Sequence, residues 1–137
     1  MNLLEKEALI AEKAVSLEHE SPEAVLKFAV ETFPNIAFAC SFGAEDVVLV
    51  DMLQKISPET DIFYLDTDFH FKETYETRDR LEQKYGKKFI RVKPDLTPEE
   101  QAAQYGDELW KTDPNKCCNL RKVEPLAKFL ARYEAWI

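Results

Sequence analysis

The sequence has 137 residues, of which 45% are hydrophobic and 32% charged, and its formal net charge is −8. This composition is typical of one globular domain and excludes a disordered chain, while the acidic balance disfavours nucleic acid as a partner because that surface attracts basic proteins. No apolar run reaches the roughly 18 residues that span a bilayer, no signal peptide is present, and three cysteines without an export signal favour a reducing cytoplasm.

The first 34 residues are predicted to form two helices. Apolar residues recur at helical spacing over residues 3–17, with glutamates and lysines between them. Ser21 and Pro22 are a typical N-cap and first helical residue. The second helix should end near Thr32, because Phe33-Pro34-Asn35 follows as a helix breaker.

From residue 35 onward, short apolar runs alternate with helical patterns. This alternation predicts right-handed βαβ crossovers and hence an α/β fold with a parallel, Rossmann-like sheet. We expect one domain over 1–137, with N-terminal helices over 1–34 and a βαβαβ core plus cysteine-pair helix over 35–137. The predicted strands are 36–40, 61–65 and 88–92, a further strand begins at Trp136-Ile137, and the predicted helices are 44–55, 71–85, one opening at Pro98, and a last helical region broken at Pro125 that ends near Tyr133.

The segment Ser41-Phe42-Gly43-Ala44-Glu45-Asp46 follows the first predicted strand and begins a helix. In parallel sheets, ligands bind beyond the carboxyl ends of the strands. Backbone N–H groups at a helix N-terminus suit a phosphate or sulfate, and Gly43 would permit a close approach. The alternative is an ordinary βα turn whose carboxylates complement the helix dipole.

A second polar segment, Leu65-Asp66-Thr67-Asp68-Phe69-His70, follows the next strand and should lie on the same rim. Its carboxylates and hydroxyl could hold a ribose or a metal, and Phe69 could stack on a base. The alternative is a solvated loop in which Asp66 and Asp68 cap turns. His70 by itself is more typical of an ordinary surface histidine than of a catalytic group.

Two adjacent cysteines, Cys117 and Cys118, are the third candidate. Asp113-Pro114-Asn115 is typical of a helix start and places both thiols in or near its first turn, where the dipole favours thiolate. Arg121 lies four residues after Cys117, and Lys122 lies four residues after Cys118. This spacing of cations and thiols favours an anionic ligand or a metal cluster. The alternative is a pair of small buried apolar residues. We interpret Cys40, the remaining cysteine, as a buried inert thiol.

Three ordered segments, SFGAEDVVL, LDTDFHFKETYE and LWKTDPNKCCNLRKVEPL, resemble those of assimilatory sulfonucleotide reductases. The cysteine pair is similar to that of the iron–sulfur type, adenylylsulfate (APS) reductase. The resemblance implies an adenine nucleotide α-hydrolase-like fold. It also implies thioredoxin-dependent reduction of APS to sulfite and AMP in sulfate assimilation, with the 3′-phosphorylated relative PAPS as the alternative substrate.

The resemblance also implies roles for individual residues. Cys117 and Cys118 match two of the four ligands of a [4Fe–4S] cluster. Lys122 matches a basic residue between cluster and substrate, and Arg121 its neighbour, both supporting catalysis. The residues that match the substrate-binding segments are Ser41, Phe42, Gly43 and Asp46 in a pyrophosphatase-type loop and Leu65 and Thr67 at the adenosine side.

The sequence also departs from the family pattern. Asp68 stands where the family usually has glycine, which puts the adenosine loop in doubt. The family continues beyond Ile137 with a C-x-x-C pair and a tail that carries the nucleophilic cysteine. We therefore expect an N-terminal portion of the fold, inactive alone, without a stable cluster in one protomer and with a possible homo-oligomeric state.

Two other functions remain as alternatives. One is a non-catalytic adenine-nucleotide-binding module. The other is an ATP pyrophosphatase of the same fold, which is disfavoured because its loop usually reads SGGxDS and Gly43 is the single glycine here.

Overall fold

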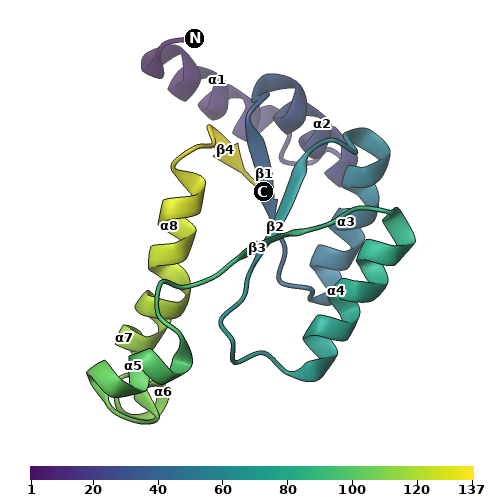
Figure 1. The fold of residues 1–137 in the computed structure, drawn as a ribbon. Coiled ribbons are helices and arrows are strands. Elements are labelled where there is room, and N and C mark those ends of the chain that lie inside the picture. The colour runs from purple at the N-terminus through teal and green to yellow at the C-terminus, as the bar shows by residue number, and fades with distance from the viewer.

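The computed structural model describes all residues, 1–137, and has the predicted α/β fold. Four parallel strands form one sheet, in the order β3-β2-β1-β4 (Figure 1). The strands are β1 (Ile36–Ala39), β2 (Asp61–Leu65), β3 (Ile90–Val92) and β4 (Ala135–Trp136). The helices are α1 (Leu3–Ser16), α2 (Pro22–Thr32), α3 (Ala44–Ile56), α4 (Lys72–Tyr85), α5 (Pro98–Tyr105), α6 (Leu109–Thr112), α7 (Pro114–Cys118), a π-helical turn η1 (Asn119–Val123) and α8 (Glu124–Leu130).

The sheet carries a hydrophobic core on each of its two faces, because successive strand residues point to opposite sides. Helices α3 and α4 lie on one side and α8 on the other (Figure 1). Phe38 and Ile62 pack with α3 and α4, whereas Phe63 packs with Phe129 of α8, with ring centroids 4.4 Å apart. Strands β1 and β2 are therefore buried on both faces, as in other parallel sheets.

The strand order places the two predicted rim loops together. The chain runs from β1 to β2 to β3 in one direction and then returns through α8 to β4 on the far side of β1. Such a reversal leaves a crevice beyond the carboxyl ends of the strands. The residues that follow β1 and β2, from Ser41 and from Asp66, lie at this end of the sheet.

The last helical region differs most from its prediction. It is four segments, α6, α7, η1 and α8, and it ends at Leu130 rather than near Tyr133. The predicted break at Pro125 takes the form of a π-helical turn, in which the Glu124 N–H donates to the Asn119 carbonyl five residues earlier. Proline lacks the N–H that would continue the regular α-helical pattern at this point. Strand β3 begins at Ile90, two residues later than predicted.

Helix α1 is confirmed but contributes no buried residue to the core. It is fixed by an Asn2 capping box, by an ion pair between Lys6 and Glu134 (2.8 Å), and by Lys13 lying over the Phe28 ring. Neither α1 nor any other helix of the structure has the length and hydrophobicity required to cross a membrane.

Candidate nucleotide and thiol site

The loop that follows β1 is held by its own side chains. The Asp46 carboxylate accepts the Ser41 N–H (2.6 Å), and the Ser41 hydroxyl accepts the Gly43 N–H (3.2 Å). Helix α3 begins after Gly43 and has no side-chain cap. Its first N–H groups therefore face the rim without helical partners, as an anion-binding helix start requires.

The positive backbone angle in this loop belongs to Phe42 rather than to Gly43. Phe42 has φ 63°, while Gly43 has φ −68°, which any residue can adopt. A left-handed non-glycine residue is unfavourable by itself, but the Phe42 ring packs at 5.3 Å from Tyr64 and 5.9 Å from Phe89. An added Cβ at position 43 would lie 3.3 Å from the Ser41 hydroxyl, so a side chain there would crowd the group that accepts the Gly43 N–H.

The rim loop that follows β2 contains a series of local hydrogen bonds. The Asp68 N–H donates to the Asp66 carboxylate (3.0 Å), and the Phe69 N–H donates to the Thr67 hydroxyl (3.2 Å). His70 Nε2 lies 2.8 Å from the Leu65 carbonyl. The predicted adenosine-side residues Leu65 and Thr67 are thus fixed in one compact turn, hereafter the rim loop (residues 65–70).

Asp66 is fully buried beneath the rim loop. Burial by itself would raise the pKa of this carboxyl. The hydrogen bonds from the Tyr75 hydroxyl (2.6 Å), the Asp68 N–H and Arg91 (2.5 Å) outweigh that effect and lower the pKa of Asp66. The same burial and the Asp66 contact raise the pKa of Tyr75 to about 12. Asp66 therefore holds the turn as a carboxylate and is not free to bind a ligand.

The cysteine pair lies on α7, as predicted. Asp113 caps this helix by accepting the Lys116 N–H (3.1 Å), and both thiols are in the first turns that follow. Cys117 is buried, with the Gln101 amide nitrogen 3.6 Å from its sulfur, whereas Cys118 is exposed. One thiol of the pair is therefore accessible to a ligand or reagent and the other is packed.

The two cations that follow the cysteines have different environments. The Arg121 guanidinium is buried and donates to the carbonyls of Thr67 and Leu96 and to the Asp68 carboxylate. Lys122 is exposed and forms no ion pair, so its ammonium group is free to meet an anion. The sequence did not distinguish these roles, because the partners of Arg121 are 25 to 54 residues away.

Two neighbouring cavities connect these features. The first, of about 180 Å³, lies at the carboxyl ends of β1 and β2, and the second, of about 660 Å³, lies beside the cysteine pair. His70 and Lys122 line both cavities, a placement of His70 that the sequence did not indicate. The first cavity contains the predicted residues Ser41, Phe42, Leu65 and Lys122; the second contains Thr67, Cys117, Cys118, Arg121 and Lys122; Gly43 and Asp46 line neither.

Cys40 is one of the residues that line the first cavity, but its side chain is buried. Burial raises the pKa of this thiol to about 11, against the opposing effect of the Phe42 N–H. A thiol with this pKa is a weak nucleophile near neutral pH. The structure thus supports the interpretation of Cys40 as an inert core residue.

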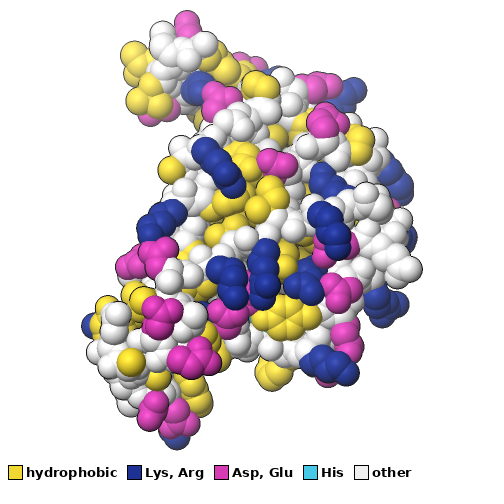
Figure 2. All heavy atoms as spheres, viewed as in Figure 1, with side chains coloured by type: hydrophobic (Ala, Val, Ile, Leu, Met, Phe, Trp, Pro, Cys, Tyr) yellow, Lys and Arg dark blue, Asp and Glu magenta, His cyan; other side chains and the backbone are white.

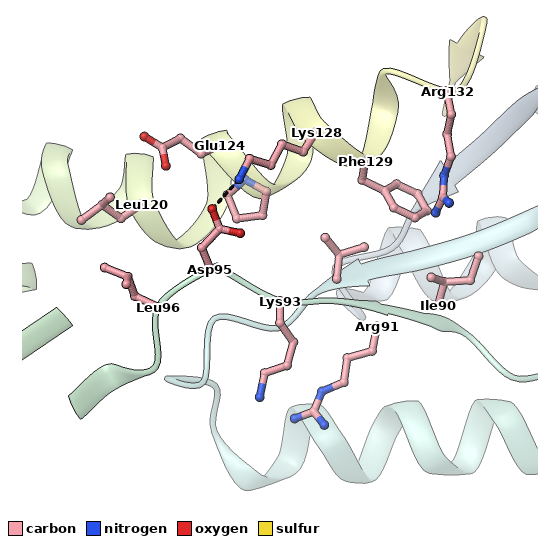
Figure 3. Close-up of a pocket in the computed structure, with 12 residues that line it drawn as sticks. Ile90, Arg91, Lys93, Asp95, Leu96, Leu120, Glu124, Lys128, Phe129 and Arg132 are labelled. Carbon is pink, nitrogen blue, oxygen red and sulfur yellow. Dashed lines mark hydrogen bonds and ion pairs between the residues drawn. The ribbon is translucent and has the colours of Figure 1, made fainter. Parts of the chain in front are cut away.

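A further groove, lined by several basic residues, borders α8. Figure 2 shows Lys and Arg side chains gathered over the middle of this face, where β3 runs in Figure 1. The groove, of about 570 Å³, lies between β3 and α8, and Asp95 pairs with Lys128 across it (Figure 3). Arg91 of β3 and Lys93, which follows β3, extend away from α8 (Figure 3) and pair with Asp66 and Asp68 of the rim loop. These two ion pairs connect the segment that contains β3 to the rim loop.

The residues of this chain do not form a complete cluster site. Cys117 and Cys118 both line the second cavity, but no group of three or more histidine, cysteine or acidic side chains lies close enough to hold a metal ion. A [4Fe–4S] cluster with four thiolate ligands needs two more than this pair supplies.

A parallel sheet with an uncapped helix start beyond its strand ends is the arrangement in which many α/β proteins bind nucleotides. The sequence matches the phosphoadenosine phosphosulfate reductase domain over residues 35–137. The chain therefore belongs to this family.

Several relatives are similar over most of this chain. Adenosine 5′-phosphosulfate reductases of Halalkalibacterium halodurans and Bacillus subtilis are 48% and 49% identical, over 89% and 82% of this chain and 54% and 49% of their own lengths. A crystal structure of phosphoadenylyl-sulfate (PAPS) reductase from Candida auris, in complex with phosphate, superposes with a TM-score of 0.79 at 33% identity, over 89% of this chain and 61% of that one. The chain spans about half the length of the curated relatives it matches.

Proposed function

We propose that this chain is the sulfonucleotide-binding portion of an adenylylsulfate reductase, which reduces APS to sulfite and AMP with thioredoxin as the reductant. The observation that carries the proposal is that Lys122 and His70 line both the cavity at the strand ends and the cavity beside the cysteine pair. A nucleotide seated at the strand ends would thus present its anionic end next to Cys118. APS is preferred over PAPS because several APS reductases are 44–50% identical, compared with 33% for the PAPS reductase structure.

In this proposal each group has a simple role. The free N–H groups at the start of α3 bind the phosphate, and the rim loop positions the adenosine through Leu65 and Thr67. Lys122 offers the one unpaired cation of the two that follow the cysteines, and it holds the sulfate by a charge-assisted hydrogen bond. Ser41 and Phe42 form the wall of the cavity between phosphate and adenosine.

Cys117 and Cys118 would supply two ligands of the family's [4Fe–4S] cluster, and the other two ligands would come from outside these 137 residues. When bound, a cluster with four thiolate ligands would carry net negative charge beside the sulfate, and the Lys122 ammonium in the same cavity would offset it. We propose no reaction step for this chain alone, because it contains no exposed thiol other than Cys118. The expected property of the isolated chain is nucleotide binding without turnover.

Calorimetry with APS and with AMP tests this proposal on the 137-residue chain. Lys122→Gln should weaken APS binding by roughly tenfold, because one hydrogen bond to a charged group is lost. Lys128→Gln is the matched control: Lys128 is paired with Asp95 outside both cavities, and its substitution should leave binding unchanged. Absence of APS and AMP binding at millimolar concentration, or equal effects of both substitutions, would overturn the proposal.

A further inference from the structure

Arg121 connects three parts of the molecule that are distant in sequence. It lies in η1, directly after the cysteine pair, and only 2% of it is exposed. Nε and Nη2 donate to the Thr67 carbonyl at 3.0 and 2.9 Å, and Nη1 donates to the Leu96 carbonyl. Nη2 also pairs with the Asp68 carboxylate at 2.9 Å, so the cysteine helix, the rim loop and the segment after β3 share one guanidinium.

The geometry of these contacts requires arginine. A planar guanidinium presents several N–H donors in a fixed fork, whereas a lysine ammonium is a point charge on a flexible stem. The acceptors lie on different sides of the group, and the Phe69 ring lies 5.6 Å from its central carbon. Lysine could satisfy one or two of these acceptors but could not hold all of them in the same arrangement.

The position of Arg121 in the chain links these contacts to the thiols. Cys118 and Lys122 line the same cavity as Thr67 and Phe69, and Arg121 is the residue between the two sets that touches the rim loop. A shift of the rim loop would therefore pull on the turn that carries Cys118 and Lys122. Lys122 forms no ion pair with the rim loop, so it does not transmit such a shift.

We propose that Arg121 is a positioning residue that holds the rim loop and the cysteine-pair helix as one unit, so that a nucleotide bound at the rim changes the accessibility of Cys118. The proposal rests on the proposed function for the identity of the nucleotide. Because coupling between two sites is reciprocal, modification of Cys118 must also change the rim loop. This second effect is measurable without any nucleotide.

The first arm of the test measures Cys118 alkylation by iodoacetamide with and without saturating AMP. In the chain without substitutions, AMP should slow the alkylation of Cys118 by roughly tenfold, which is within the usual range of coupling between sites. The slowing should be lost in Arg121→Met and in Arg121→Lys, at AMP concentrations shown by calorimetry to saturate each variant. Arg132→Met is the matched control, since Arg132 lies over the Phe129 and Tyr133 rings away from the rim, and it should retain the effect.

The second arm uses hydrogen exchange at the Asp68 and Phe69 amides, both of which donate within the rim loop. Alkylation of Cys118 should change the exchange rates of these two amides in the chain without substitutions and in the Arg132→Met variant. It should leave these rates unchanged in the Arg121→Lys variant. Retention of AMP protection and of the exchange response in the Arg121→Lys chain would overturn the proposal. Failure of AMP to bind the unmodified chain would instead count against the proposed function, and the exchange arm would still decide the role of Arg121.

Discussion

Asp66 and Arg121 are the two buried charged residues of the molecule, and both hold the rim loop. Asp66 supports it from below through Tyr75 and Arg91, and Arg121 holds it from the side of the cysteine pair. Buried charges are unfavourable unless they are paired and hydrogen-bonded. Their concentration under one loop indicates that its shape is specified by electrostatics rather than by apolar packing.

Substitution Asp66→Asn should destabilise the protein and change its response to acid. At pH 7 we expect a loss of about 2 kcal/mol in the free energy of unfolding, because hydrogen bonds to a charged partner are lost. The pKa of Asp66 is lowered in the folded state, so its stabilisation is complete above the unfolded pKa of about 3.9 and is lost as pH falls through the lowered value. The difference between the two proteins should therefore shrink on acidification. Urea unfolding at pH 7, 4 and 3 measures this difference in the free energy of unfolding.

Asp95→Asn is the control for this experiment, since Asp95 forms an exposed pair with Lys128. We expect it to change stability by less than about 0.5 kcal/mol, as surface pairs usually do. A constant difference between Asp66→Asn and the unmodified chain from pH 7 to 3 would contradict the assigned pKa direction.

Asp68 shows why a residue that departs from the family pattern need not change the loop. It has φ 63°, a conformation that glycine adopts freely and that aspartate tolerates better than most residues. Its carboxylate lies 3.1 Å from Lys93 and 2.9 Å from Arg121. These partners are distant in sequence, so the conformation and ion pairs of Asp68 could not be predicted from the sequence.

At the scale of elements, the cysteine pair depends on a very short helix. Helix α7 has five residues, and Asp113 provides its single side-chain cap. It is followed by the π-helical turn, whose wider spacing places Arg121 inward and leaves Lys122 exposed. Short helices are marginal by themselves, so capping and tertiary contacts determine whether α7 is formed.

Substitution Asp113→Ala should therefore open α7 locally. An N-cap contributes about 1 kcal/mol, so alkylation of the buried Cys117 should accelerate by roughly fivefold. Asp113→Asn is the matched variant, because asparagine caps helices about as well as aspartate, and it should react like the unmodified chain. Peptide mass spectrometry separates modification of Cys117 from that of Cys118. Equal Cys117 rates in all three proteins would show that the cap does not control this helix.

An element could be predicted from the sequence where residues close together in the chain determine it, and could not be predicted where distant residues do. Strands β1 and β2 and helices α3 and α4 were predicted closely, because a local apolar pattern and a C-cap such as Gly86 define them. Helix α6 and the π-helical turn were not predicted, because α6 is a single short turn packed against α7 and the π-helical turn has no local sequence pattern apart from Pro125. At the candidate site, most of the residues proposed from the sequence line two cavities and Gly43 and Asp46 line neither, while the different environments of Arg121 and Lys122 depend on burial.

At the scale of the whole molecule, the N-terminal helix and the candidate site lie at opposite ends of the sheet. Lys6 of α1 pairs with Glu134, which precedes β4, and the Glu134 N–H donates to Asn35, which precedes β1. These residues mark the amino ends of the strands, whereas both cavities lie at the carboxyl ends. Folding of the site therefore should not require α1.

Deletion of residues 1–17 tests this independence. Because α1 buries no residue and is held mainly by one surface ion pair and one cation–π contact, the shortened chain should unfold cooperatively with a free energy within about 1 kcal/mol of the full chain. Urea unfolding and AMP calorimetry measure stability and the site separately. Lys6→Ala in the full chain isolates the ion pair. Loss of cooperative unfolding on deletion, with Lys6→Ala unaffected, would mean that the apolar face of α1 contributes to the core despite its exposure.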